Sequence, residues 1–153
     1  MGYGSNFQIS FYHFYALEAD WDGGVVEISI NDNEWTDVTQ VGGTFAIGYN
    51  TTELEENPAQ ALQNRPVYSG RNINSGVYGE VETISFGSAL NGNNVKFRFR
   101  VGSDGNTNDA GWWIDNIKFT NVTSGLFSDV IAGDSVECDN RLPVVSVTDM
   151  TVS

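Results

Sequence analysis

Residues 95–101 read V-K-F-R-F-R-V, and this stretch decides the fold class of the chain. Valine or phenylalanine stands at every odd position, and lysine or arginine stands at every even one. Side chains of a β-strand alternate between the two faces of a sheet. The stretch is therefore predicted to be a strand with one apolar face, which packs on a core, and one basic face.

Other predicted strands lie on both sides of this one. Residues 25–30 alternate in the same way, with Val26, Ile28 and Ile30 on one face. Residues 8–17 carry bulky aromatic and β-branched side chains on both faces, which is typical of a central strand of a sandwich. Further strands are predicted at residues 34–38, 81–86 and 112–119.

The composition favours an all-β fold. The chain has 17 glycines, an aromatic share of 12 % and no long run of helix-forming residues. Its 153 residues fit one antiparallel β-sandwich and a tail. We predict the sandwich at residues 7–122. Residues 123–153 are either an acidic linker that leads into a following domain or a tail whose last strand folds back onto the sandwich.

The net charge of -13 restricts the classes of partner. A surface this acidic repels nucleic-acid backbones and anionic membranes, so neither is an expected partner. No apolar stretch is long enough to cross a membrane. The same surface supplies carboxylates for hard cations such as Ca²⁺. The single cysteine, Cys138, rules out an internal disulfide framework, and we interpret it as a free thiol or a linker residue.

The acidic turn at residues 18–24, E-A-D-W-D-G-G, is the first candidate metal site. Glu18, Asp20 and Asp22 alternate along an extended segment, so their side chains can share one side. Crowded carboxylates repel one another unless a cation binds them. The turn is therefore predicted to take part in a structural Ca²⁺ site.

Asp115 is the fourth predicted ligand of that site. It lies in W-I-D-N-I among large apolar residues, and a buried lone carboxylate needs a partner. The partner is either a Ca²⁺ ion shared with the acidic turn or an arginine such as Arg98 or Arg65. A set of solvated acids without an ion is the remaining alternative.

A second acidic loop spans residues 104–109, D-G-N-T-N-D. It is rich in oxygen ligands, but it lacks the length and the terminal glutamate of an EF-hand. We interpret it as a polar loop. The alternative is that it carries Asp104 or Asp109 towards the ion.

The only histidine, His13, stands in the middle of the F-Y-H-F-Y strand. A catalytic triad would have to use it, and a packed structural histidine is the expected role at such a position. The sequence also contains no phosphate loop and no zinc-protease helix motif. We therefore predict that the chain has no enzymatic activity.

Several aromatic and basic residues are weak candidates for ligand binding. Aromatic residues in strands usually belong to the core, whereas an aromatic residue in a turn is expected to be exposed. The basic residues either bind acidic sugars or pair with acids on neighbouring strands. These candidates are Tyr12, Phe14, Trp21, Trp112, Arg98 and Arg100.

Three segments resemble a known module in their order and spacing. They are residues 11–29, F-Y-H-F-Y-A-L-E-A-D-W-D-G-G-V-V-E-I-S, residues 64–70, N-R-P-V-Y-S-G, and residues 95–117, which contain V-K-F-R-F-R-V-G-S-D and G-W-W-I-D-N-I. Together they resemble the MAM-like jelly-roll module found beside the catalytic domain of bacterial immune-inhibitor-A-type and related secreted peptidases. Asn116 stands where that family has the second acidic residue of its D-D-I motif.

The resemblance implies an antiparallel jelly-roll β-sandwich, a secreted or cell-surface bacterial protein, and a cation site at the aspartate that matches Asp115. We therefore predict a non-catalytic, Ca²⁺-stabilised accessory module of an exported, peptidase-associated multidomain protein. Its expected partners are neighbouring domains of the parent chain and a protein or polysaccharide ligand. The alternatives are a carbohydrate-binding module, which an exposed aromatic platform would favour, and a cell-surface adhesin unit.

Overall fold

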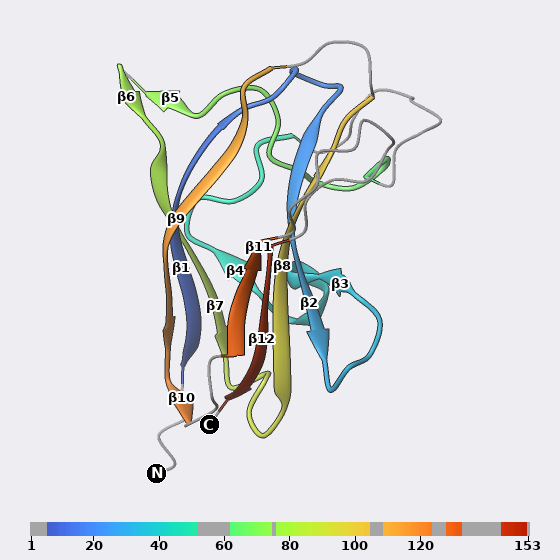
Figure 1. Ribbon diagram of the computed structural model, residues 1–153, viewed down its shortest axis with the longest axis vertical. Helices are drawn as coiled ribbons and strands as arrows, with labels where there is room; N and C mark the ends of the chain where they lie inside the picture. The colour runs from blue at the N-terminus through green and yellow to red at the C-terminus, as the bar shows by residue number, and fades with distance from the viewer. Residues whose placement is uncertain are drawn as a thin grey trace.

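The computed structural model describes residues 6–51, 62–74, 76–104, 109–123, 128–132 and 145–152. Two antiparallel β-sheets pack against each other in these residues (Figure 1). The helix in the described residues is a single 3₁₀ turn, η1 (Val38–Val41). The prediction of an all-β sandwich is confirmed.

The first sheet has the strand order β4-β7-β1-β9. Its strands are β1 (Phe7–Ala16), β4 (Thr44–Phe45), β7 (Glu80–Gly87) and β9 (Gly111–Thr120). β1 is a central strand, as its two bulky faces predict, because it pairs with β7 on one side and with β9 on the other. Alternate β1 side chains are buried against the second sheet, from Phe7 to Tyr15.

A β-bulge interrupts the pairing of β1 with β9. Ser10 pairs with Lys118 and Tyr12 pairs with Asp115, so β9 holds one extra residue between these pairs. Asn116 adopts a φ of 53° at this point. A one-residue bulge reverses which face the following side chains occupy, and the burial of β9 changes phase there accordingly.

The second sheet has the strand order β10-β12-β8-β2-β3, and β11 pairs with β12. The stretch V-K-F-R-F-R-V forms most of β8, and its Val95, Phe97 and Phe99 side chains are buried, as predicted. The strands of this sheet are β2 (Gly23–Ile30), β3 (Thr36–Asp37), β8 (Asn94–Gly102), β10 (Val122–Thr123), β11 (Ser128–Ala132) and β12 (Val145–Val152).

Different structural elements lie at the two ends of the sandwich. The start of β1 and the end of β12 lie at the lower end in Figure 1. The turn that joins β1 to β2 lies at the upper end, together with a short hairpin of β5 (Ile73–Asn74) and β6 (Val77–Tyr78). β12 pairs antiparallel with β8, so residues 145–152 are part of the second sheet.

Aromatic side chains fill the space between the sheets. Phe11 of β1 and Phe99 of β8 meet edge to face, with ring centroids 4.9 Å apart. Phe7 and Phe97 pack together with their centroids 6.0 Å apart. Each fully buried phenylalanine contributes roughly 1.5–3 kcal/mol by the removal of its apolar surface from water.

The structure corrects one local prediction and adds one feature that the sequence did not show. The strand predicted at residues 34–38 shortens to the two residues of β3, because the Asp37 side chain caps η1 by accepting a hydrogen bond of 2.9 Å from the Thr39 N–H. The alternation assigned no burial to the second face of β2, and this face is buried as well. Val25 there packs against Leu62 and Val67, which cover this face of the sheet.

Residues 67–72 hydrogen-bond to both sheets at the upper end. The Tyr68 N–H and C=O exchange 2.8 Å hydrogen bonds with the C=O and N–H of Gly24 in β2. The Gly70 carbonyl accepts a 2.8 Å bond from the Leu17 N–H, immediately after β1. The Asn72 Oδ1 accepts a 2.8 Å bond from the Tyr15 N–H. Residues 67–72 therefore connect the end of β1, in the first sheet, to the start of β2, in the second sheet.

The Glu82 carboxylate of β7 lies fully buried inside the sandwich. Its two oxygens accept hydrogen bonds of 3.1, 3.1 and 2.7 Å from the N–H groups of Ala46, Ile47 and Gly48. The Tyr68 hydroxyl donates a further bond of 3.1 Å. A buried carboxylate is stable only when such donors surround it, so Glu82 holds the loop after β4 and the Tyr68 ring in place.

We expect Glu82→Gln to lower the free energy of unfolding by about 2–4 kcal/mol, because the amide loses the charge-assisted bonds and turns an NH₂ group towards N–H donors. Urea denaturation measures this. Exposed Glu34 gives the matched control, since Glu34→Gln is expected to change the free energy by less than about 0.5 kcal/mol. Equal effects of the two substitutions would contradict the role given to Glu82.

Candidate metal site and ligand-binding surfaces

Ser69, in the segment of residues 67–72, holds the backbone of the acidic turn through hydrogen bonds. The Asp20 N–H donates to the Ser69 Oγ at 3.0 Å, and the Ser69 hydroxyl donates to the Asp22 carbonyl at 2.7 Å. Asp20 adopts a φ of 68°, which lets the chain reverse direction within the turn. The Asp22 N–H closes the turn on the Glu18 carbonyl at 2.9 Å. The backbone of residues 18–22 is therefore fixed from two sides.

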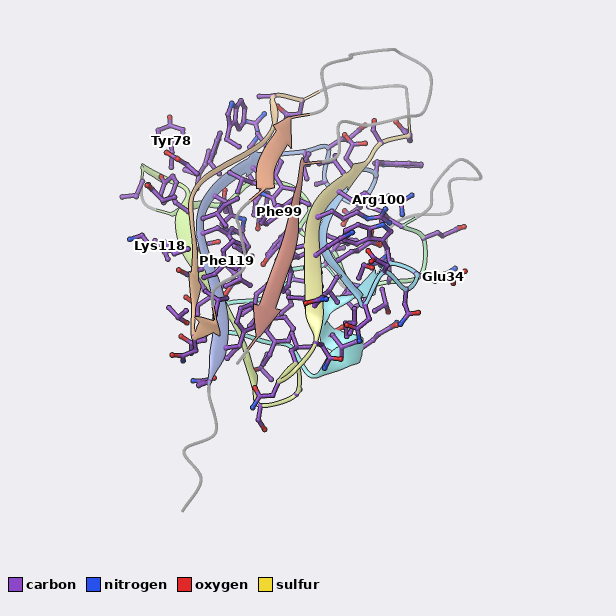
Figure 2. The ribbon with its side chains drawn as sticks, turned by 60° about the horizontal axis from the view of Figure 1, so that its bottom comes forward. Glu34, Tyr78, Phe99, Arg100, Lys118 and Phe119 are labelled. Carbon is purple, nitrogen blue, oxygen red and sulfur yellow. The ribbon has the colours of Figure 1, made fainter. Side chains whose placement is uncertain are left out.

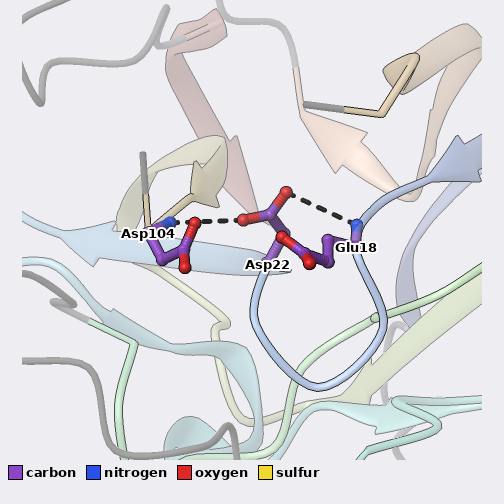
Figure 3. A group of neighbouring side chains, drawn as sticks. All are labelled: Glu18, Asp22 and Asp104. Atoms are coloured by element: carbon purple, nitrogen blue, oxygen red, sulfur yellow. Dashed lines mark hydrogen bonds between the residues drawn. The ribbon is translucent and has the colours of Figure 1, made fainter. Parts of the chain in front are cut away.

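Three carboxylates converge at this turn. Glu18 and Asp22 come from the turn, and Asp104 comes from the end of β8, which pairs with β2 (Figure 3). One carboxylate oxygen from each residue lies within 4.8 Å of the others. Oxygen ligands at this separation can be bridged by one cation such as Ca²⁺, whose ligand distances are about 2.3–2.6 Å.

Asp22 is the most enclosed of the three, with 4 % of its surface exposed. Its Oδ1 accepts a hydrogen bond of 3.3 Å from the Asp104 N–H, and its Oδ2 accepts one of 3.4 Å from the Glu18 N–H (Figure 3). Burial raises the pKa of the Asp22 carboxyl, and the charge of Asp104 adds to this rise, although hydrogen bonds from the Ser103 side chain and the two N–H groups oppose it. A cation between the carboxylates would relieve the unfavourable ionisation.

The other two predicted ligands lie elsewhere. Asp20 is exposed and is not part of the cluster. Asp115 was expected to be buried, but it is exposed on the outer face of β9, opposite Tyr12, and its Oδ1 accepts a 2.7 Å bond from the Asn116 N–H. It lies four residues along β9 from Gly111, which pairs with Ala16, so about 13 Å of strand separates it from the turn.

Arg98 and Arg100 lie on the outer face of β8 and point to a buried acid of β2. The Glu27 carboxylate, 2 % exposed, accepts hydrogen bonds of 2.6 Å from Arg98 Nε and 2.7 Å from Arg65 Nη1. Arg100 Nη1 lies 3.8 Å from it. Arg98 also packs over the Trp35 ring, 4.5 Å from its centroid. The prediction that Arg98 and Arg100 pair with acids on neighbouring strands is confirmed.

His13 and Trp112 belong to the core. His13 has no exposed surface, and its Nδ1 accepts a 3.2 Å hydrogen bond from Trp112 Nε1. The Trp112 ring packs on Phe99 and on Tyr68, so it is not the exposed ligand-binding residue that the sequence offered as a candidate. Gly24 permits this packing, because a Cβ atom there would lie 2.7 Å from the Trp112 ring.

Trp113 is the exposed tryptophan of the pair, with 49 % of its surface accessible. The alternation of β9 could have identified it, because Trp112 and Ile114 share the inner face and Trp113 must then point outwards. Tyr12 and Trp21 are partly exposed, at 37 % and 38 %. Trp21 lies in the acidic turn, and Tyr12 lies on the outer face of β1.

No family model, curated protein or solved structure matches this chain. In the described part of the chain, no helix has the length and hydrophobicity needed to cross a membrane. Cys138 lies outside the described residues.

Burial lowers the pKa of His13 to about 4, although the negative charge of Glu82 opposes the shift. The unfolded chain takes up this proton near the ordinary value of 6.5, so between pH 6.5 and pH 4 acidification favours unfolding. We expect a loss of about 3 kcal/mol across this window that His13→Phe does not show. Parallel urea titrations of the two proteins at several pH values measure it.

The ionisation itself can be followed separately. His13 is the only histidine, so its imidazole signal in an NMR titration needs no assignment by mutation. A midpoint near pH 4 is expected. A midpoint at pH 6 or above would contradict the buried, neutral state of this side chain.

Proposed function

We propose that the chain is a non-catalytic, Ca²⁺-stabilised accessory module of an exported multidomain protein, and that it acts by binding. The observation that carries this proposal is the convergence of Glu18, Asp22 and Asp104 at the β1–β2 turn. Two of the four metal ligands expected from the sequence, Glu18 and Asp22, are therefore kept in the proposed site. Asp104 is the third ligand, in place of Asp20 and Asp115.

The position of the cluster supports a structural role for the ion. Glu18 follows β1 of the first sheet, whereas Asp22 and Asp104 flank β2 and β8 of the second. A cation there would join the two sheets at the end where residues 67–72 already bridge them. Extracellular modules bind Ca²⁺ with dissociation constants of about 10⁻⁴–10⁻³ M, and we expect an affinity in this range for a partly exposed site with three carboxylates.

Two features support a binding role rather than catalysis. The single histidine is enclosed by Phe11, Tyr15 and Tyr68 instead of facing a cleft. Arg98 and Arg100 of β8 both form ion pairs with Glu27, so they serve the fold. Neither arrangement presents a base or a nucleophile to a substrate.

A MAM-like jelly-roll connectivity is part of the same proposal. Chain-consecutive strands change sheets repeatedly: β1 and β2, β3 and β4, β7 and β8, and β8 and β9 lie in different sheets. Such crossing connections are typical of Greek-key and jelly-roll sandwiches. The resemblance to modules of secreted peptidases adds the exported setting and a neighbouring domain of the parent chain as a partner.

Thermal unfolding with Ca²⁺ and with a chelator tests the metal site. For a dissociation constant of about 1 mM, Ca²⁺ at about 10 mM adds about 1.4 kcal/mol and raises the midpoint by roughly 3–6 °C, because the ion binds only the folded chain. Asp22→Asn is expected to abolish this rise. Asp20→Asn is the matched control and is expected to retain it.

The result has a second control in the choice of ion. Mg²⁺ demands a smaller octahedral site and is expected to give a much smaller shift at the same concentration. Equal midpoints of the wild-type chain in Ca²⁺ and in chelator would refute the metal site. A rise that survives Asp22→Asn would place the ion elsewhere.

A further inference from the structure

The outer face of the first sheet exposes a group of aromatic rings that the proposed metal site does not use. Trp113 stacks on Phe14 with ring centroids 5.0 Å apart, and Phe14 meets the Tyr78 ring edge to face at 5.6 Å. The Tyr12 hydroxyl donates a hydrogen bond to the Tyr78 carbonyl. We call these four residues the aromatic surface. It is continuous across β9, β1 and β6.

The aromatic surface is open to solvent. Tyr78 is 62 % exposed, Trp113 49 % and Tyr12 37 %, and the neighbouring Val81 is 60 % exposed. Figure 2 shows Tyr78 and Lys118 on one side of the molecule, and Arg100 and Glu34 on the other. Contiguous exposed apolar surface of this kind marks a site of interaction, because a folded chain otherwise keeps such rings inside.

A shallow hollow continues this surface along the sheet. It has a volume of about 280 Å³ and is lined by Ser10, Phe11, Tyr12, Val81, Asn116 and Lys118. The β-bulge creates its polar side, since the extra residue of β9 brings both Asn116 and Lys118 to the outer face. Tyr12 lines the hollow and also belongs to the aromatic surface. Rings and hydrogen-bonding groups are thus adjacent, as in sites for small polar ligands.

The outer face of the first sheet differs from the whole chain in its net charge. Among the described outward-facing side chains of β1, β7 and β9, the charged ones are Asp115 and Lys118, whose formal charges cancel. The whole chain carries a net charge of -13. A face without net charge fits an uncharged ligand, and the acidity of the whole chain disfavours a second copy on this face through repulsion.

We propose that the outer face of the sheet β4-β7-β1-β9 binds a neutral polysaccharide. The faces of sugar rings carry C–H groups that pack on aromatic rings, and the exposed Trp113 ring offers such a contact. The Ser10, Asn116 and Lys118 side chains in the hollow can hydrogen-bond the hydroxyl groups of a neighbouring sugar unit. This inference rests on the proposed function only in taking the chain to be a binding module.

Affinity electrophoresis tests the proposal, with xylan, laminarin, galactomannan and hydroxyethyl cellulose in the gel and with pull-downs on insoluble cellulose and chitin. The wild-type chain is expected to be retarded or retained by at least one of them. Trp113→Ala is expected to weaken that binding by about tenfold or more, as loss of a central aromatic contact does. Val81→Glu places a charge at the hollow and is expected to weaken it similarly.

The controls use the other exposed tryptophan and the unfolding midpoint. Trp21→Ala, in the acidic turn, is expected to leave binding unchanged within about twofold. Unchanged unfolding midpoints of Trp113→Ala and Val81→Glu separate lost binding from lost folding. Because Val81 is exposed, its substitution keeps the test valid where Trp113→Ala lowers stability.

Several outcomes would overturn the proposal. They are absence of binding to every neutral polysaccharide of the set, binding to acidic alginate alone, binding that survives both substitutions, and dimerisation in sedimentation that Trp113→Ala abolishes. A Ca²⁺-dependent rise in the unfolding midpoint without polysaccharide binding would refute this inference and support the proposed metal site. Polysaccharide binding without a Ca²⁺-dependent rise would support this inference and refute the proposed metal site.

Discussion

The sandwich depends on a short backbone segment that pairs with both of its sheets. Residues 67–72 exchange main-chain hydrogen bonds with Gly24 at the start of β2 and accept one from Leu17 at the end of β1. The same segment supplies Ser69, which holds the acidic turn, and Tyr68, whose ring packs in the core. The geometry of the carboxylate cluster is therefore a consequence of how the two sheets are joined.

Two buried carboxylates hold the residues around this segment, one from the core and one from the outer face of β2. Glu82 faces the core and accepts a hydrogen bond from the Tyr68 hydroxyl. Glu27 faces outwards on β2 and binds Arg65, which also contacts Asp37 at 2.8 Å. Each acid is almost completely removed from water and accepts hydrogen bonds from several donors. Replacing a donor leaves a buried charge that is less well compensated, which is why such carboxylates constrain the fold strongly.

The sequence predicted the strands well where alternation was clear. The period of two in residues 95–101 gave β8 and its core face, and the bulky residues 8–17 gave the central position of β1. It did not show that the second face of β2 is buried, because a pattern of apolar and polar residues cannot reveal that Leu62 and Val67 cover this face. Glu27 and Glu82 were missed for the same reason, since an acid within a strand is ordinarily exposed.

The candidate site was predicted in part. Spacing alone placed Glu18 and Asp22 in one turn, but it could not show that the positive φ of Asp20 turns that side chain away. Asp104 was named only as an alternative, because its proximity depends on the pairing of β2 with β8. The burial expected for Asp115 ignored the alternation along residues 112–115, in which Asp115 shares a face with Trp113 and not with Trp112 and Ile114. The spacing of Ile114 and Ile117 also signals the β-bulge, because two inward residues three positions apart require one extra residue.

The position of the strand ends has a mechanical consequence. The chain enters β1 and leaves β12 at the same end of the sandwich, and these strands lie in different sheets (Figure 1). A force applied between those two points acts across the strands and not along them. It would load the hydrogen bonds of β1 and β12 one pair at a time, so the module would peel open from its lower end under low tension. The joined upper end, with residues 67–72 and the carboxylate cluster, would be the last part to separate.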